Sequence, residues 1–424
     1  MHHFSYSSGV LCAESVSVAQ MAAEVGTPFY CYSDATLKRH LRIFTEAMAG
    51  LDATVCFAVK ANSNLAVIRT LVAQGAGCDV VSGGELQLAL QAGCTPDKIV
   101  FSGVGKTEDE LRLALKHNVG QINIESEAEL HTLSRIAAEL GKTARIALRV
   151  NPDVDAGSLD KISTGRKEDK FGIEWTLAPA LYRKARELPG VDPAGVAVHI
   201  GSQITSLKPF EAAFTRVREL ITALRADGFE IRHLDLGGGL GIPYDHKRNA
   251  DQPPGPDAYG EMVKRTVGDL GCKLTFEPGR ILVGNAGILV SRVVAIKEST
   301  TRRFVILDAA MNDLVRPAMY DALHEIIPVT EPPTSSVYGP VDVVGPICET
   351  TDCFAKGYQL PPLKAGDLVA FMSAGAYGAA MSSMYNARPL VPEVLVSGNQ
   401  YAVVRRRPSF AEMTALEQMP PWLP

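Results

Sequence analysis

The hydrophobic positions between residues 54 and 277 form eight short runs with the length and composition of buried β-strands. The runs cover residues 54–59, 78–81, 99–102, 121–125, 145–150, 196–200, 233–236 and 273–277. Between them, apolar residues recur at three- and four-residue spacing, which predicts helices over segments such as 64–74, 84–92, 108–117, 126–140 and 209–227. This alternation predicts βα units and a parallel sheet.

Eight such units predict closure into a (β/α)8 TIM-like barrel, an α/β fold. An open, doubly wound sheet is the alternative. It is disfavoured because polar or glycine-rich residues follow nearly every predicted strand, as a ring of active-site loops requires.

The pattern changes after Arg280, where strand-like runs recur without long helices and are separated by proline and glycine. These runs cover residues 288–296, 304–307, 341–344, 368–371 and 401–404. We therefore predict a barrel domain at 29–278 and a mostly-β domain made of 1–28 plus 279–424, because residues 1–28 do not begin a βα unit.

Composition narrows the class of protein. A chain of 424 residues is too long for one ordinary core, which agrees with two domains. The net charge of −5 comes without any Lys/Arg run, so nucleic acid is not an expected partner. The apolar runs are too short for a membrane span. The eight cysteines contain no CxxC pair, and residues 1–5 lack a signal-peptide pattern, so we expect a cytoplasmic protein without disulfides or a metal site.

Candidate chemistry lies where the predicted strands end. Lys60 follows the first run, at the end of a barrel strand where active sites are built. An amine beside apolar neighbours can lose its proton and form a Schiff base with an aldehyde, of which pyridoxal phosphate is the common biological example. A surface lysine after a buried strand is the alternative interpretation.

Three further strand ends carry functional groups. His199 ends the sixth run and could stack on a planar cofactor. The glycines 237–239 follow the seventh run, where exposed backbone N–H groups can approach a phosphate. Glu277 ends the eighth run and could contact a protonated pyridine nitrogen, while Gly279 and Arg280 could bind an anion.

The second domain contains three unusual segments. Arg316 and Tyr320 are four residues apart and would share one helix face. Cys348 and Glu349 place a thiol beside a carboxylate, and Tyr377 is isolated among small residues. Taken singly, these residues are also explained by a surface ion pair, a buried thiol and a packing aromatic.

Together these segments resemble the fold-type III pyridoxal-phosphate-dependent decarboxylases, and most closely the diaminopimelate decarboxylases among them. The matching segments are 57–62, 199–203, 236–239, 277–280, 316–320, 348–349 and 376–378, in the order typical of the family. The resemblance implies an alanine racemase-like barrel with a second, mostly-β domain that contributes substrate and dimer contacts. It also implies pyridoxal 5'-phosphate as cofactor and decarboxylation of meso-2,6-diaminopimelate to L-lysine, with release of carbon dioxide, as the last step of lysine biosynthesis.

The resemblance also implies a role for each matching residue. Lys60 would hold the cofactor covalently, His199 would stack on its ring and Glu277 would face the ring nitrogen. The phosphate would lie among Ser202, Gly238, Gly239, Gly279 and Arg280. The distal carboxylate of the substrate would bind Arg280, Arg316 and Tyr320, with Tyr377 contacting both cofactor and substrate. Cys348, as proton donor, and Glu349 would come from the other subunit of a homodimer.

Related activities remain open alternatives: decarboxylation of ornithine, arginine or carboxynorspermidine, or a regulatory relative without activity. Arg316 disfavours a cationic substrate tail, and Lys60 with Cys348 disfavours a protein without catalysis. Residues 156–165 resemble the family's loop after strand five, but they lack the histidine that many members carry near Ser158. This departure affects loop closure and substrate discrimination more than the type of reaction.

Overall fold

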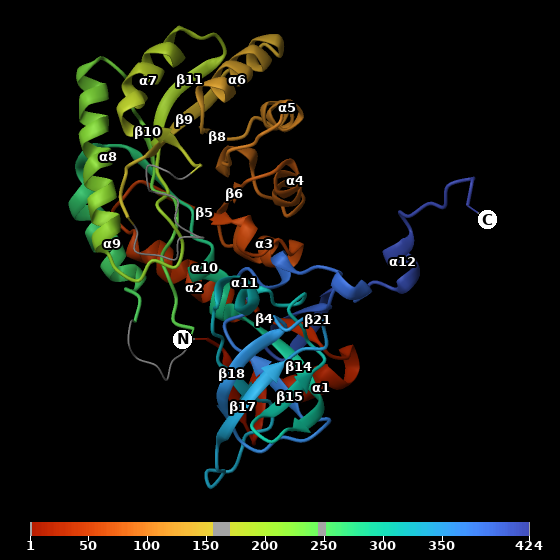
Figure 1. Cartoon of the computed structure of the whole chain (residues 1–424). Coiled ribbons are helices and arrows are strands. Elements are labelled where there is room, and N and C mark those ends of the chain that lie inside the picture. The colour runs from red at the N-terminus through yellow and green to blue at the C-terminus, as the bar shows by residue number, and fades with distance from the viewer. Residues whose placement is uncertain (1, 156–169, 245–251, 424) are drawn as a thin grey trace. The chain divides into compact units, whose positions relative to one another are not determined.

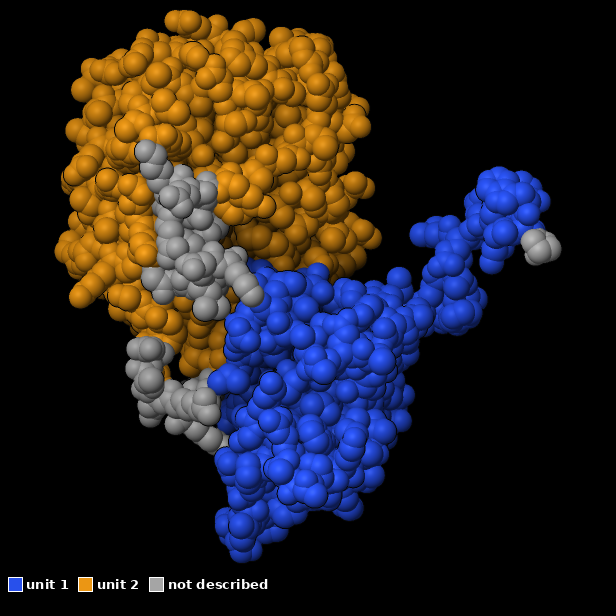
Figure 2. All heavy atoms as spheres, in the orientation of Figure 1, with its two compact units in different colours: residues 1–36, 285–424 blue, residues 37–284 orange. Residues whose placement is uncertain are grey.

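The computed structural model describes residues 2–155, 170–244 and 252–423 (Figure 1). Within it the chain forms two compact units (Figure 2). One consists of Leu37–Gly284, and the other combines Met1–Thr36 with Asn285–Pro424. Each unit has its own sheet and is described separately below.

The first unit is a closed barrel of eight parallel strands, as predicted. In order around the barrel the strands are β5 (Ala53–Ala58), β6 (Gly77–Val80), β7 (Ile99–Phe101), β8 (Gln121–Ile124), β9 (Ala144–Asn151), β11 (Val191–Ala197), β12 (His233–Asp235) and β13 (Lys273–Phe276). The parallel pairing of β13 with β5 completes the ring. That pairing rules out the open-sheet alternative, because an open sheet would leave two edge strands. A short strand, β10 (Ile173–Glu174), adds to β9.

Helices flank the barrel strands, and all except the first follow one of these strands (Figure 1). They are α2 (Asp34–Ala47), α3 (Leu65–Val72), α4 (Gly83–Gln91), α5 (Glu108–His117), α6 (Glu127–Glu139), α7 (Ala178–Glu187), α8 (Lys208–Ala226), α9 (Pro256–Val267) and α10 (Arg280–Val283). The side chains of Asn64, Ser82, Thr107 and Ser126 each accept a backbone N–H in the first turn of the helix that follows. These caps explain why the helices begin soon after the strands end.

The second unit is mostly β, as predicted. Its main sheet has the order β18 (Cys353–Leu360), β17 (Gly339–Val344), β15 (Arg303–Leu307), β14 (Gly287–Glu298), β4 (Phe29–Ser33), β20 (Glu393–Ser397) and β21 (Gln400–Arg405). Strand β19 (Leu368–Phe371) also pairs with β14, and β16 (Ile326–Pro328) pairs with β19. A separate three-stranded sheet contains β1 (Phe4–Ser7), β2 (Val10–Ala13) and β3 (Val16–Ser17), and the short helices are α1 (Val18–Val25), α11 (Arg316–Tyr320) and α12 (Phe410–Thr414).

Strand β4 shifts the division of the chain relative to the prediction. The predicted boundaries lie after residues 28 and 278, whereas the compact units divide after residues 36 and 284. The first boundary moves because β4 pairs antiparallel with β14 and parallel with β20. All five of its residues are buried, so its sequence is typical of a barrel strand and does not reveal which sheet it joins.

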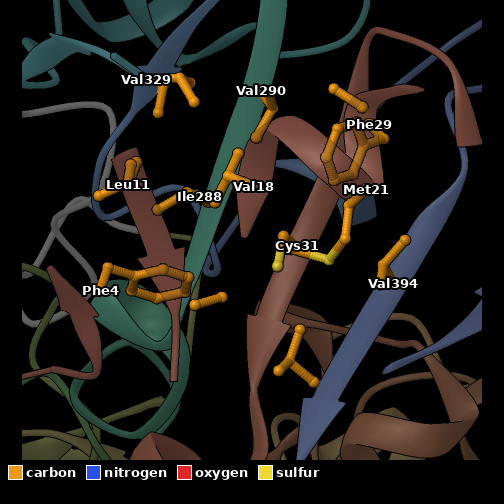
Figure 3. Close-up of a cluster of buried hydrophobic side chains, with 14 of the residues drawn as sticks. Phe4, Leu11, Val18, Met21, Phe29, Cys31, Ile288, Val290, Val329 and Val394 are labelled. Atoms are coloured by element: carbon orange, nitrogen blue, oxygen red, sulfur yellow. The ribbon is translucent and has the colours of Figure 1, made fainter. Parts of the chain in front are cut away.

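The amino-terminal residues are held in the second unit by a shared hydrophobic core (Figure 3). Phe4, Leu11 and Val18 come from the first 18 residues and pack with Ile288 and Val290 of β14. A backbone hydrogen bond of 2.7 Å from Leu11 N to Val329 O joins the same regions. The N-terminal strands therefore complete the second unit by packing against its sheet, although they pair mainly with one another.

Candidate functional site

Lys60 lies in a single turn, Val59–Ala61, directly after β5. Its Nζ atom is 2.9 Å from Oδ2 of Asp79, which is fully buried in β6, while the lysine side chain is 34% exposed. A buried carboxylate stabilises the ammonium form and holds the side chain in one orientation. Lys60 is therefore an oriented amine at the carboxyl end of the barrel strands, and the surface-lysine alternative does not describe it.

Lys60 lines a cavity of about 530 Å3 that lies within the barrel unit. This volume is in the usual range for small-molecule sites. The lining residues are Lys60, Val81, Ser82, Ser102, Gly103, Val104, Gly105, Glu110, Asn123, Arg149, Phe171, Ala197, Val198, His199, Asp235 and Glu277. The structure thus brings together three residues predicted from the sequence: Lys60, His199 and Glu277.

His199 follows β11 and presents a neutral ring to the cavity. The backbone N–H of Gly238 donates to its Nδ1 atom at 3.1 Å, so that nitrogen carries no proton. Burial and the positive charges of Arg149 and Lys60 lower the pKa of His199 well below its ordinary value. A flat, uncharged ring fixed by a backbone hydrogen bond suits stacking on a planar ligand.

Glu277 follows β13 and is hydrogen-bonded to Asp235 at the end of β12. Burial, together with the negative charges of Asp235 and Asp79, raises the pKa of Glu277 well above its ordinary value. Burial also raises the pKa of Asp235, to about 6, although hydrogen bonds from Asn123 and Gly237 oppose that shift. Two adjacent buried carboxyl groups cannot both ionise easily, so the pair retains a proton at neutral pH.

A network of uncharged side chains behind these carboxyl groups was not predicted. Asn123 donates to Asp235 Oδ2 and to Ser102 Oγ, each at 3.0 Å, and Ser102 donates to Glu277 Oε1 at 3.3 Å. Gln121 donates to Asn123 Oδ1 at 2.9 Å. The signal was present in the sequence, because Gln121, Asn123 and Glu125 alternate along one predicted strand and so face the same side.

The glycines after β12 are required by the packing of neighbouring loops. A Cβ atom on Gly238 would lie 2.2 Å from the carbonyl oxygen of Glu277, and one on Gly239 would lie 2.5 Å from that of Gly201. Gly239 also has a φ of +115°. The close approach of these backbones explains both glycines without a ligand, so their phosphate contact stays a prediction.

Arg280 and Ser202, two residues predicted at the phosphate, lie in contact. Arg280 NH2 donates to Ser202 Oγ at 2.9 Å, and Arg280 NH1 donates to the hydroxyl of Tyr244. Arg280 begins α10 directly after Gly279. A buried guanidinium beside a hydroxyl group forms a chemically suitable anion site.

Arg149 and Glu125 form a buried ion pair at the rim of the cavity. Arg149 NH1 lies 2.6 Å from Glu125 Oε1, and the side chains are 9% and 2% exposed. The backbone N–H groups of Gly103 and Gly172 also donate to this carboxylate. Glu125 therefore anchors the chain after β7 and the chain before β10.

We expect Arg149→Met to lower the free energy of unfolding by about 3–5 kcal/mol, because it leaves the Glu125 carboxylate buried without its partner. Equilibrium urea denaturation measures this change. The matched control, Arg149→Met/Glu125→Gln, removes the unpaired charge and should recover most of the loss. If Arg149→Met unfolds at the same urea concentration as the wild type, the proposed anchoring role of the Arg149–Glu125 pair is contradicted.

In the second unit, Arg316 and Tyr320 lie on α11, as predicted. Arg316 is 5% exposed, and its NH1 donates to His324 Nε2 at 2.7 Å. His324 Nδ1 in turn donates to the carbonyl oxygen of Met372 at 2.9 Å. The surface-ion-pair explanation is therefore wrong for Arg316, which is an internal, oriented cation.

Cys348 is exposed, so the buried-thiol explanation is wrong for this residue. Its backbone N–H donates to Asn386 Oδ1 at 3.2 Å. Glu349 accepts hydrogen bonds from Tyr385 and, at 2.9 Å, from Thr351, and these bonds lower the pKa of Glu349. The segment therefore presents a thiol and an ionised carboxylate at the surface of its unit.

Tyr377 is half-buried, with a backbone φ of +56°. This left-handed conformation is unfavourable for a bulky residue and is held only where the surrounding structure requires it.

Residues 156–165, which resemble the family's loop after strand five, lie outside the described residues. Within 2–155, 170–244 and 252–423, no helix is long and apolar enough to cross a membrane.

Comparisons with known proteins show which family the chain belongs to. A family model described as "Pyridoxal-dependent decarboxylase, pyridoxal binding domain" matches residues 34–284. A diaminopimelate decarboxylase of Zymomonas mobilis is 51% identical, over 99% of this chain and 99% of that protein. A diaminopimelate decarboxylase of Vibrio cholerae is 47% identical, over 99% and 100% respectively.

Solved structures are similar over the same extent. The diaminopimelate decarboxylase of Helicobacter pylori complexed with L-lysine is 38% identical, with a TM-score of 0.89 over 94% of this chain and 98% of that chain. The diaminopimelate decarboxylase of M. jannaschi is 36% identical, with a TM-score of 0.93 over 99% of this chain and 98% of that chain.

Proposed function

The chain belongs to the pyridoxal-dependent decarboxylases and, within them, to the diaminopimelate decarboxylases, and from this premise we propose a function and residue roles. The protein is a carboxy-lyase that converts meso-2,6-diaminopimelate to L-lysine and carbon dioxide. The observation that carries the proposal is the cavity in which Lys60, a neutral His199 and Glu277 converge. The Helicobacter pylori relative was crystallised with L-lysine, the expected product.

The residues present suit pyridoxal 5'-phosphate as the cofactor. Lys60 offers an amine for its aldehyde group, and His199 offers a flat, neutral ring for stacking. Glu277 offers a carboxyl group for the ring nitrogen. Ser202, Gly238, Gly239, Gly279 and Arg280 would surround the phosphate, where Arg280 and Ser202 already lie in hydrogen-bond contact. When bound, the cofactor withdraws electrons from the carbon that loses its carboxylate.

The remaining roles concern the substrate. Arg280, Arg316 and Tyr320 bind the distal carboxylate, and Glu349 binds the distal amine as an ionised carboxylate. Tyr377 contacts both substrate and cofactor. For Arg316 the support is its burial and its hydrogen bond to His324, which fix a cationic fork in one orientation.

Cys348 supplies the proton that replaces the carboxylate. Its Sγ–H bond breaks as a new C–H bond forms, and the thiolate then recovers a proton from solvent. Exposure of Cys348 on its unit agrees with delivery to a second copy in a cytoplasmic homodimer, in which Cys348 and Glu349 complete the partner's site.

Carbon dioxide release tests the substrate assignment. Purified protein with pyridoxal phosphate should release carbon dioxide from meso-diaminopimelate at a much higher kcat/KM than from ornithine, arginine or lysine. The physical reason is that only diaminopimelate presents both a distal carboxylate and a distal amine to Arg316 and Glu349. A preference for ornithine would overturn the substrate and leave the reaction type in place.

A further inference from the structure

Asp235, which ends the strand next to that of Glu277, has no role assigned so far. The two residues end the adjacent strands β12 and β13, and they are 1% and 6% exposed. They are hydrogen-bonded to each other, and both line the cavity that contains Lys60. Two adjacent carboxyl groups, those of Glu277 and Asp235, therefore line the cavity here.

Asp235 is built to remain an anion. The backbone N–H of Gly237 donates to its Oδ1 at 3.0 Å, while Asn123 and Gln121 donate to its Oδ2 at 3.0 and 3.2 Å. All three donors are neutral amide groups, so they solvate the negative charge without cancelling it. Glu277, by contrast, receives a longer hydrogen bond of 3.3 Å from the hydroxyl of Ser102. The single proton of the pair therefore belongs on Glu277.

Other titratable groups around Glu277 do not reverse this assignment. Asp79 adds a second negative charge, and Lys60 adds a positive one. The lysine lies at 2.9 Å from Asp79, so these two charges largely oppose each other at Glu277. Cys56 of β5 is buried, and nearby carboxylates further raise the pKa of its thiol, so it stays neutral. Among the charged groups around Glu277, Asp235 is therefore the one whose negative charge is not offset by a neighbouring positive charge.

We propose that Asp235 is a positioning residue: its fixed carboxylate keeps one proton on Glu277, so that Glu277 always presents a hydrogen bond to the ring nitrogen. This inference rests on the proposed function for the identity of the ring. The proton is shared between the Glu277 oxygen and the nitrogen, bonded to one and hydrogen-bonded to the other. Asp235 prevents its loss to solvent as the pH rises, because ionising Glu277 would place two negative charges side by side.

Infrared difference spectroscopy of the full-length protein without cofactor tests the proton directly. The wild type should show a protonated carboxyl band at pH 7 that is lost in Glu277→Gln. In Asp235→Asn, Glu277 should ionise at least about one pH unit lower, a tenfold loss of proton affinity. The matched control Gln121→Ala removes a donor to Asp235 but no charge, and it should keep the band at pH 7. Absence of the band from the wild type would overturn the inference even if Asp235→Asn does not fold.

Nitrogen NMR with 15N-labelled pyridoxal phosphate extends the test to the loaded protein. In the wild type the ring nitrogen should keep its hydrogen-bonded proton to a pH at least about one unit higher than in Asp235→Asn. We expect kcat to fall more than KM rises in that variant. An unchanged nitrogen titration would overturn the inference. If the protein binds no pyridoxal phosphate, the proposed function fails, while the infrared result still decides the role of Asp235.

Discussion

Lys60→Ala is expected to abolish covalent attachment of pyridoxal phosphate and to lower kcat/KM strongly, because the variant lacks the amine that forms the Schiff base. Lys60 supplies the amine that the cofactor's aldehyde requires, and Asp79 holds that amine at the cavity. The wild type should absorb near the blue edge of the visible. Sodium borohydride should abolish that band and leave a stable label on Lys60, which peptide mapping locates.

The exposed Lys98 of the same barrel provides the matched control. Lys98→Ala removes an amine from the barrel surface and should retain both the band and the activity. Labelling at a residue other than Lys60, or a Lys60→Ala protein with activity close to that of the wild type, would refute the assignment. A purified wild type with no such band after addition of pyridoxal phosphate would contradict the cofactor itself.

Mixing two inactive variants tests whether each site is shared between subunits. Lys60→Ala and Cys348→Ala should each be strongly impaired, Cys348→Ala by about 100- to 10,000-fold because it lacks the proton donor. After subunit exchange, about half of the dimers are mixed and each has one intact site, so the mixture should regain about a quarter of the wild-type activity. Carbon dioxide release from meso-diaminopimelate measures the recovery.

Two controls make that result decisive. A chain carrying both substitutions, mixed with Cys348→Ala, provides no Cys348 to any site and should recover no activity. Sedimentation must show that the mixed chains form dimers. If exchange is complete and activity does not return, Cys348 acts within its own chain or does not act as the proton donor.

The barrel could be predicted from the sequence because its strands are short apolar runs that alternate with helices, and four of these helices, α3 to α6, begin at local side-chain caps. Lys60, His199 and Glu277 could be placed for the same reason, since the end of a parallel strand fixes which edge of the barrel a residue reaches. Such information is local, and the predicted strand and helix boundaries differ from the observed ones mainly by a few terminal residues.

The sequence does not show which residues far apart along the chain contact one another. The pattern of β4 shows that it is buried, but only the fold shows that it joins β14 and β20. Asn123 resembles an ordinary polar position until Ser102 and Asp235 are brought to it from other strands. The environment of Arg316 likewise depends on His324 and Met372, which α11 alone does not specify. In each case the missing information is which distant residue supplies the partner.

The position of β4 between β14 and β20 has a consequence for synthesis on the ribosome. β4 is made before the whole barrel, and its partner β20 follows roughly 360 residues later. At about 5–20 residues per second, this apolar strand waits about 20–70 s for its second neighbour. The barrel is contiguous in sequence and can fold during that interval, while the N-terminal segment must be kept from aggregation. Completion of the second unit is therefore a late event that follows synthesis of the whole barrel.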